Sequence, residues 1–190
     1  MKRLYHQLMH CWGEAADILV FDARDRDPSL AVVHVAVWDA TEDGDVTIFN
    51  TMGMSERRMP GADYFTEVNL GIRGAIEEHD RRRLAAFLAN VAEYPFCHAR
   101  KLDWWERLSN PGNIPCFPGC TQLLLTPCLT DGGFSRFNPP DEEVKLLYAT
   151  PTTSKENHIL TVHGRQAFLD YLIEHELDLF APRTDPTHER

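Results

Sequence analysis

The run Thr51-Met52-Gly53-Met54-Ser55 closes the apolar segment Val46-Thr47-Ile48-Phe49 and is followed shortly by Met59-Pro60. The apolar segment alternates along its length, which is typical of a β-strand with one buried face. The run is not a catalytic motif by its spacing, because Ser55 lacks the last glycine of a nucleophile elbow. It therefore marks the end of a strand, and the elements around it must decide the fold.

Upstream of this run, the sequence predicts a hairpin. Residues 31–38 are rich in β-branched side chains, and the following link contains Asp43-Gly44, which suits the positive φ angles of a tight turn. We therefore expect an antiparallel hairpin over residues 31–53. Further strands are expected at residues 18–21 and 64–72, and a short helix at residues 3–13.

Downstream, apolar residues recur at helical spacing between Leu84 and Val91. Asp80 is expected to cap this helix and Pro95 to end it. Residues 109–120 contain three prolines and two glycines, which predict a loop. A strand is expected next, at residues 122–129.

The last third of the chain predicts a strand at residues 144–149, after a long loop marked by residues 131–133 and 138–140. Ser154 is expected to cap a final helical region, which Gly164 divides into a short and a longer helix. The longer helix has an apolar stripe made of Phe168, Leu169, Leu172 and Ile173. The order of elements predicts an α+β fold with a largely antiparallel, mixed sheet and helices packed on one side. We expect one domain over residues 1–182 and a polar tail at 183–190.

Composition narrows the class of partner. The 19 basic and 29 acidic residues give a formal net charge of −10, which repels nucleic acid and anionic lipid and favours a basic partner. The alternative interpretation is that this charge only keeps the protein soluble. No apolar run approaches the roughly 20 residues that a membrane span needs. The N-terminal segment is interrupted by His6, Gln7 and His10, so we expect no secretory signal. The odd number of cysteines then predicts reduced thiols and a cytoplasmic protein.

The cysteines and one histidine form the candidate site for chemistry: Cys97, His98, Cys116, Cys120 and Cys128. Four such side chains close in space would suit tetrahedral zinc. However, no second cysteine pair follows Cys116 and Cys120, and Cys128 lies in an apolar strand, where a free thiol behaves as a small hydrophobe. The sequence also has no phosphate loop, dinucleotide fingerprint or paired histidine motif. We therefore expect no catalytic residue, metal or cofactor, and retain a thiol- or zinc-dependent enzyme of residues 97–128 as the alternative.

Aromatic residues provide the candidate binding anchors. Trp104 and Trp105 are adjacent and precede the proline-rich loop, which carries Phe117. Adjacent side chains on a helix diverge by about 100°, so one can pack inward while the other faces outward. Exposed aromatic residues of this kind often anchor protein interfaces. The alternative interpretation is that both tryptophans close the edge of the core.

The order of these segments resembles the suppressor of fused-like domain family. That family has a strand ending in Thr-x-Gly-Met-Ser, then Met and Pro, a strand containing Glu, a Leu-rich helix ending near Pro, a Gly-Asn-x-Pro-like loop, and two strands that run into Pro. The matching residues here are Thr51, Gly53, Met54, Ser55, Met59 and Pro60, followed by Glu67–Leu70, Leu84–Pro95, Gly112–Pro115, Leu123–Pro127 and Leu146–Thr152. The resemblance spans about residues 10–180.

This resemblance implies a non-catalytic protein-binding module. The larger animal member of the family sequesters a zinc-finger transcription factor by gripping an extended peptide between two lobes, and this chain is similar to only one lobe. Single-domain bacterial relatives are associated with immunity against polymorphic toxins. The resemblance thus implies an immunity protein that neutralises a toxin, and the acidic charge of the chain fits a basic one. The contacts expected from the aromatic pattern are Trp104, Trp105 and Phe117. A scaffold with an endogenous partner remains open, as does the oligomeric state.

Overall fold

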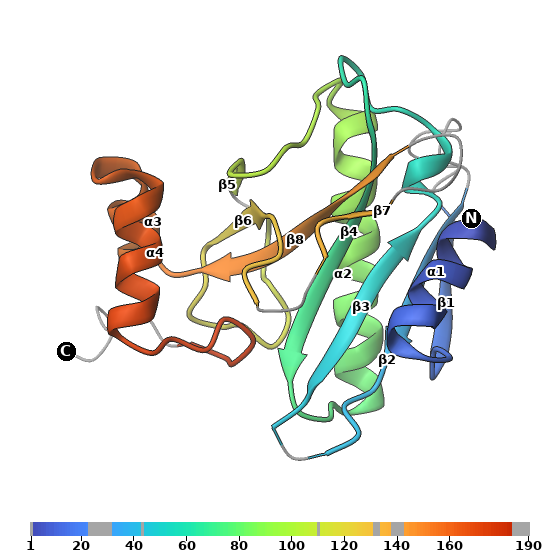
Figure 1. Cartoon of the computed structure of the whole chain (residues 1–190), viewed down its shortest axis with the longest axis horizontal. Helices are drawn as coiled ribbons and strands as arrows, with labels where there is room; N and C mark the ends of the chain where they lie inside the picture. Colours follow the sequence, from blue (N-terminus) through green and yellow to red (C-terminus); the bar gives the residue numbers. More distant parts are fainter. Residues whose placement is uncertain are drawn as a thin grey trace.

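A single mixed sheet forms the centre of the molecule (Figure 1). The computed structural model describes residues 2–22, 32–42, 44–109, 111–130, 134–137 and 143–183. The strands are β1 (Asp17–Asp22), β2 (Val32–Trp38), β3 (Val46–Met52), β4 (Phe65–Arg73), β5 (Arg107–Ser109), β6 (Gln122–Thr126), β7 (Arg136–Phe137) and β8 (Val144–Thr152). The helices are α1 (Lys2–Trp12), α2 (Glu78–Cys97), α3 (Ser154–Val162) and α4 (Gly164–Glu174), with a 3-10 turn at Met54–Glu56.

The strand order is β1-β2-β3-β4-β8-β6-β5, and β7 pairs with β8 off this path. All of these neighbours are antiparallel except β4 and β8, which run parallel. The predicted α+β class and the largely antiparallel, mixed sheet are therefore confirmed. The β2–β3 hairpin is also confirmed, and Gly44 in its turn has a φ of 94°. Asp43 lies outside the described residues.

The two faces of the sheet carry different helices. Val33, Val35 and Val37 of β2 belong to the large core cluster that includes the buried side of α2. The alternate residues Ala36 and Trp38 belong to a second cluster, together with α1. Because side chains alternate between the faces of a strand, α1 and α2 cover opposite faces. In the view of Figure 1, α2 runs behind the strands. This corrects the expectation that the helices pack on one side.

Helix α2 differs from its prediction at both ends. It starts at Glu78 after the cap residue Glu77, rather than at Asp80, and continues past Pro95 to Cys97. A proline removes one backbone hydrogen bond from a helix. Here the proline lies in the last turn, where few further bonds depend on it, so the helix does not end there. The predicted apolar face is confirmed, since Leu84 and Leu88 are fully buried.

The C-terminal third also shifts slightly from its predicted bounds. Strand β6 ends at Thr126, while β8 extends to Thr152 because its second half pairs with β6. Thr153, rather than Ser154, caps α3 and forms a reciprocal capping box with Glu156. In α4, Phe168 and Leu172 are buried, but Ile173 of the predicted stripe is 74% exposed.

The predicted long loop marked by residues 131–133 and 138–140, and the predicted polar tail at residues 183–190, cannot be compared with the structure in full. The loop residues 131–133 and 138–142, and the tail beyond residue 183, lie outside the described residues. None of the helices in the part of the chain that the structure describes is long and apolar enough to cross a membrane.

Candidate functional site

The Thr51–Ser55 run surrounds a buried carboxylate, that of Glu67 on the neighbouring strand β4. Glu67 has no exposed surface. Its Oε2 accepts a hydrogen bond from the Thr51 hydroxyl at 2.6 Å. Its Oε1 accepts from the Gly53 N–H at 2.9 Å, the Ser55 N–H at 3.0 Å and the Ser55 hydroxyl at 2.6 Å. We call Thr51, Gly53, Ser55 and Glu67 the motif socket.

The conformation of the chain explains the glycine in this socket. Gly53 has a φ of 121°, a region that residues with a side chain rarely adopt, and it presents its N–H directly to the carboxylate. Met54 and Met59 are both buried in the main core. The Met59 sulfur accepts the Leu102 N–H at 3.4 Å. The motif residues therefore fix the end of β3 onto β4.

The protonation of Glu67 reflects two opposing effects. Burial raises the pKa of this carboxyl above its usual value of 4.5, because desolvation disfavours the charge. The hydrogen bonds from Ser55, Thr51 and Gly53 act in the opposite direction without overcoming the effect of burial. With its oxygens occupied by the protein itself, Glu67 is placed to hold the fold together.

The two tryptophans lie in a turn rather than on a helix, and they pack against different clusters. Trp104 is half-buried, and its indole N–H donates to the Leu146 carbonyl at 2.8 Å. The Lys145 ammonium lies 4.0 Å from the centre of its ring, and the Arg136 guanidinium 5.0 Å. Trp105 is also half-buried, with a φ of 69°.

The third expected anchor, Phe117, is 0% exposed and belongs to the main core. It has no surface to offer a partner in the folded chain. The sequence pattern could not reveal this, because a proline-rich loop is usually exposed. The three aromatic residues therefore do not converge on one surface, and only Trp104 and Trp105 remain as accessible contacts.

The five cysteines form no disulfide bond, and they differ in their surroundings. Cys97 is exposed at the end of α2, Cys120 is buried, and Cys116 and Cys128 are intermediate. Burial raises the pKa of the Cys116 thiol, which is opposite to the shift that activates a nucleophilic cysteine. Within the described ranges, no three His, Cys, Asp or Glu side chains stand close enough to hold a metal ion.

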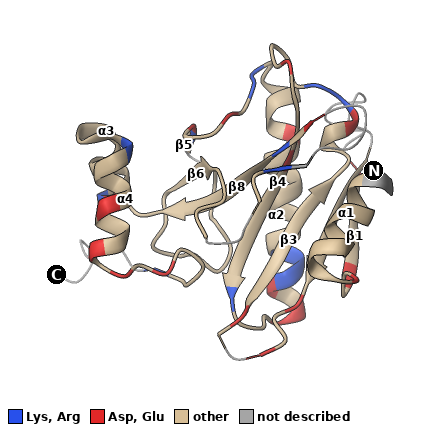
Figure 2. Cartoon of the chain, viewed as in Figure 1, with Lys and Arg blue, Asp and Glu red and all other residues tan. Residues whose placement is uncertain are grey.

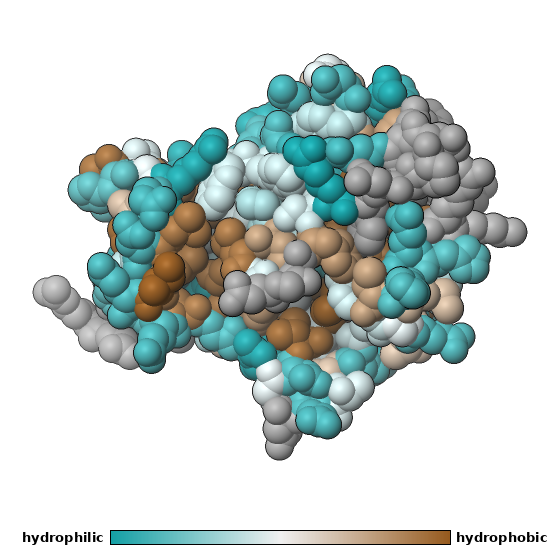
Figure 3. All heavy atoms as spheres, viewed as in Figure 1, coloured by the Kyte–Doolittle hydropathy of each residue, from teal (hydrophilic) through white to brown (hydrophobic). Residues whose placement is uncertain are grey.

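A groove crosses the face of the sheet that carries α1. One hollow of about 510 Å³ lies against Trp12, Ile48, Phe134 and Tyr148. A second, of about 500 Å³, lies against Leu169, Leu172 and Ile173 of α4. A narrow hollow of about 30 Å³ joins them, and Thr130 and Phe180 line all three. We call these hollows together the front groove, and Figure 3 shows hydrophobic residues gathered along this face.

The front groove exists because two parallel strands separate. The β4–β8 ladder runs from Phe65↔Val144 to Asn69↔Tyr148 and ends there. Beyond that point β8 pairs with β6 on its other side, while β4 continues beside β3. The opening between them is bordered by the segment that follows α4, residues 177–183, which we call the C-terminal strap.

The strap is anchored to β4 at close range. The Arg73 N–H donates to the Phe180 carbonyl at 2.8 Å, and the Arg73 guanidinium binds both carboxylate oxygens of Asp178, at 2.7 and 3.1 Å. The Phe180 ring lies so close to Gly71 that a Cβ on this glycine would meet it at 2.7 Å. Arg183 ties the end of the strap to the buried Glu156, at 3.2 Å.

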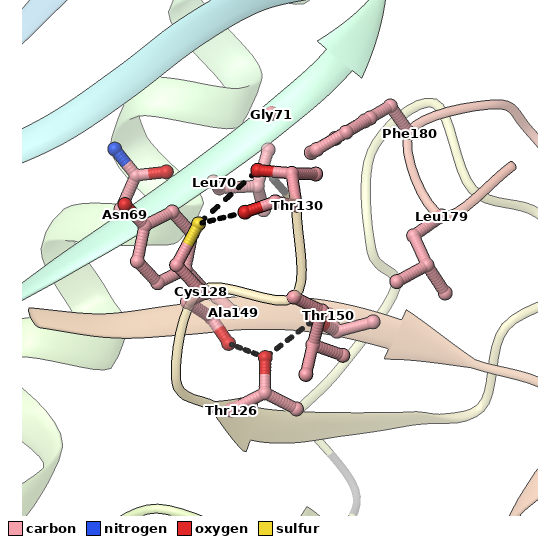
Figure 4. A pocket seen from close by; sticks show the side chains of 12 residues that line it. Asn69, Leu70, Gly71, Thr126, Cys128, Thr130, Ala149, Thr150, Leu179 and Phe180 are labelled. Carbon is pink, nitrogen blue, oxygen red and sulfur yellow. Dashed lines mark hydrogen bonds between the residues drawn. The ribbon is translucent and has the colours of Figure 1, made fainter. Parts of the chain in front are cut away.

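Several polar groups that line the narrow hollow form hydrogen bonds within the protein (Figure 4). The Cys128 sulfur lies 3.2 Å from the Thr130 hydroxyl, and the Thr126 hydroxyl lies 3.2 Å from that of Thr150. The Tyr148 hydroxyl donates to the Phe134 carbonyl at 2.8 Å, and burial raises its pKa, so the phenol stays protonated. These hydroxyls and this thiol therefore make their polar contacts within the protein.

A protein-family model described as Suppressor of fused protein (SUFU) matches residues 26–183. The chain belongs to the suppressor of fused family. This confirms the resemblance drawn from the order of the motifs. The comparison with curated proteins gave no match.

Solved structures of SUFU proteins share the fold of this chain. A structure described as a SUFU homologue from Neisseria gonorrhoeae FA 1090 matches with a TM-score of 0.69 and 14% identity, over 99% of each chain. Sufu in a Sufu–Fu complex matches with a TM-score of 0.64 and 14% identity, over 97% of this chain and 89% of the other. Drosophila Suppressor of Fused matches with a TM-score of 0.62 and 13% identity, over 93% of this chain and 46% of its own length.

In this SUFU-family chain, charge is distributed unevenly around the front groove. Figure 2 shows Asp and Glu on α4 at the left of the view, on the segment after it, and at the β2–β3 turn at the bottom. Arg73 lies beside the α4 hollow but is engaged by Asp178, while Glu176 in the same hollow is exposed. The groove is thus apolar at its floor and acidic at one end.

Proposed function

We propose that this SUFU-family chain is a non-catalytic protein-binding module that neutralises a basic toxin as an immunity protein. The observation that carries the proposal is the front groove, which leaves apolar side chains of α1, β3 and α4 partly exposed on one face. Monomeric soluble proteins rarely leave a large continuous apolar surface open unless it binds something. The SUFU chain in the Sufu–Fu complex was crystallised with a protein partner, which makes the same class of function reasonable here.

The charge of the chain supports a basic partner. A net charge of −10 accelerates encounter with a positively charged protein and disfavours association with nucleic acid. The apolar floor of the groove would then determine how long the complex lasts, because most differences in affinity lie in the dissociation rate.

Trp104 and Trp105 belong to this proposal as a second contact region. Each keeps part of its surface exposed, and a hot-spot tryptophan costs about 2 kcal/mol or more of binding energy when replaced by alanine. Because Trp104 also bonds to the Leu146 carbonyl, the stability of Trp104→Ala must be measured beside its affinity. Unchanged affinity in both Trp104→Ala and Trp105→Ala would remove these residues from the interface.

The test is affinity capture from extracts of the native cell, followed by purification of the retained protein and calorimetric titration. We expect a basic protein that binds one-to-one and whose production alone stops bacterial growth, with growth restored when this chain is co-produced. A captured partner that is harmless by itself would contradict the immunity role and leave the binding module standing. Failure to retain any protein that binds after purification would contradict the binding module itself.

A control tests the alternative that the chain is a thiol- or zinc-dependent enzyme built on residues 97–128. Cys116→Ser and Cys120→Ser should leave the affinity for the captured partner unchanged, since neither side chain lines the front groove. Loss of the biological effect in either variant, with the fold and affinity intact, would argue for thiol chemistry instead.

A further inference from the structure

Strand β1 forms one edge of the sheet and carries apolar side chains at its surface. Among the described residues it pairs with β2 alone. Val20 is 62% exposed and Ile18 is 40% exposed. Natural proteins often protect an edge of this kind with lysine or proline, and β1 contains neither. The edge is therefore able to pair with a further strand.

The backbone of β1 presents hydrogen-bonding groups along this edge. The Ile18 N–H donates to the Asp17 carboxylate at 2.7 Å, which marks it as an amide that faces away from β2. Successive amides point to opposite sides of a strand, so the Val20 N–H and carbonyl face the same way as those of Ile18. The centre of the outward-facing backbone is thus at Val20.

This edge is complementary to itself. In an antiparallel pairing centred on Val20, the Val20 side chains of two copies lie opposite each other, and each Leu19 lies opposite Phe21 of the partner subunit. Leu19 and Phe21 both pack against the main core, so this cross-strand pair would extend an apolar surface that already exists. Asp17 and Asp22 lie on opposite faces of the strand, because an odd number of positions separates them, so the pairing brings no two carboxylates face to face.

We propose that two copies of this chain pair through β1, antiparallel and about a two-fold axis at Val20, which joins their sheets into one. Such an interface uses the same surface on both copies and therefore closes as a dimer. Two paired strands of six residues bury less than the roughly 1,200 Å² of a standard stable interface, so the dimer should form in a concentration-dependent way. The proposal goes beyond the proposed function and does not depend on it.

The first test is disulfide trapping in the full-length chain, with the exposed Cys11 and Cys97 replaced by serine in every variant. In the two-fold pairing Val20 lies opposite its own copy, whereas the two Ile18 residues are about 13 Å apart. A disulfide needs Cα atoms within about 7 Å of each other. We therefore expect Val20→Cys to form a covalent dimer with oxidised glutathione, and Ile18→Cys to form about tenfold less of it.

The second test is sedimentation velocity over a range of protein concentrations. Val20→Lys places like charges opposite each other and should raise the dissociation constant of the dimer about tenfold or more. Val162→Lys adds the same charge at a 58% exposed position on α3 and should leave the constant unchanged. Asp17→Ala removes a negative charge and the acceptor that competes for the Ile18 N–H, so it should strengthen the dimer. Circular dichroism checks that each variant is folded.

Salt separates this dimer from a complex with a basic partner. Each copy has a formal net charge of −10, so two copies repel each other, and the dimer should become stronger as added salt screens this repulsion. The complex with a basic toxin should weaken under the same change, because salt then screens an attraction.

Several results would overturn the proposal. These are a chain that stays monomeric at every concentration, equal trapping of Val20→Cys and Ile18→Cys, and a dimer that Val20→Lys leaves intact. Weaker binding of the captured partner protein to Val20→Lys, without self-association of the wild type, would assign the edge to that partner instead. No residue of β1 lines the front groove, so failure of the dimer would leave the proposed function standing.

Discussion

The motif socket and the front groove both include residues of β4. In the socket the polar groups are hydrogen-bonded within the protein, whereas in the groove apolar side chains stay partly exposed. Glu67, near the start of the strand, has its carboxylate occupied by hydrogen bonds from Thr51, Gly53 and Ser55. Asn69 and Gly71, towards its end, border hollows whose apolar walls stay partly exposed. The comparison teaches that one strand can hold the fold at one end and leave a surface for a partner at the other. We therefore expect substitutions in the socket to change stability and substitutions in the groove to change binding.

The largest expected effect is that of Glu67→Ala. It removes the shared acceptor of the socket and leaves buried donors without partners, so we expect the free energy of unfolding to fall by about 3–5 kcal/mol. Glu67→Gln keeps one carbonyl oxygen and should cost less, about 1–2 kcal/mol. Urea unfolding followed by circular dichroism measures both. Equal losses of unfolding free energy in the two variants would show that the acceptor oxygen does not stabilise the socket.

The difference in stability between wild type and Glu67→Gln is also predicted to depend on pH. Because burial raises the pKa of Glu67 above 4.5, the folded state favours its neutral form. The resulting stability is present below pH 4.5 and is lost as the pH rises through the folded-state pKa. The wild type should therefore lose stability relative to Glu67→Gln as the pH increases from 4 to 8. A constant difference between the two unfolding curves would contradict the upward shift.

The next effect in size concerns the junction of the strap with β4. Gly71→Ala would push a Cβ against the Phe180 ring, which lies 2.7 Å from that position, and against Val46 at 2.8 Å. Overpacking of this kind costs about 1–3 kcal/mol. Replacing Phe180 with alanine should reduce the cost, and a double-mutant cycle of the unfolding free energies measures the coupling. Additive losses would mean that Phe180 does not limit the space at Gly71.

A smaller effect is expected at the ion pair that anchors the strap. The Arg73 guanidinium lowers the pKa of Asp178 below 3.8, so its stabilising contribution is present above that pH and lost as the pH falls through the lower folded-state value. Both side chains are more than a third exposed, at 38% and 35%, and solvent screening limits the contribution to about 0.5 kcal/mol or less. Asp178→Asn should differ from wild type at pH 7 and converge with it as the pH falls below 3.8 and through the lower folded-state pKa. Thermal unfolding at several pH values tests this, and divergence at low pH would contradict it.

The smallest effect on stability is expected at the rim of the groove. Ile173→Lys and Val162→Lys should each change the unfolding free energy by no more than about 0.5 kcal/mol, because both side chains are largely exposed. The two variants should nevertheless differ in binding, since only Ile173 lines the α4 hollow. A large loss of stability in Ile173→Lys would place this residue with the fold rather than with the partner surface.

Local patterns in the sequence predicted most of the elements. The alternation in residues 46–52 and the turn after β2 defined the hairpin, and the spacing of Leu84 and Leu88 defined the buried side of α2. These signals depend only on residues that are close in the sequence, so they can be recognised without knowing how the rest of the chain folds. Pro95 was misleading for the same reason, because its effect depends on how much helix follows it.

The sequence predicted the candidate sites less well than it predicted the helices and strands. Thr51, Gly53 and Ser55 were recognised as a pattern, but nothing local shows that their hydrogen bonds meet on Glu67. Phe117 was expected at the surface because its loop is rich in proline, but it is buried in the main core, whose other members come from distant parts of the chain. Contacts of this kind join residues far apart in the chain and leave no periodic signal.

The sequence alone determined the elements, the family and the acidic charge of this protein, since periodicity, motif order and composition are properties of neighbouring residues and of their sum. Only the tertiary structure decided where a partner can bind. The front groove brings together the end of α1, the second half of β4, Thr130 and the strap after α4, because β4 and β8 pair for part of their length and then separate. Strand pairing across such distances is set by the packing of the whole core, so the position of the opening follows from the fold and not from any one segment.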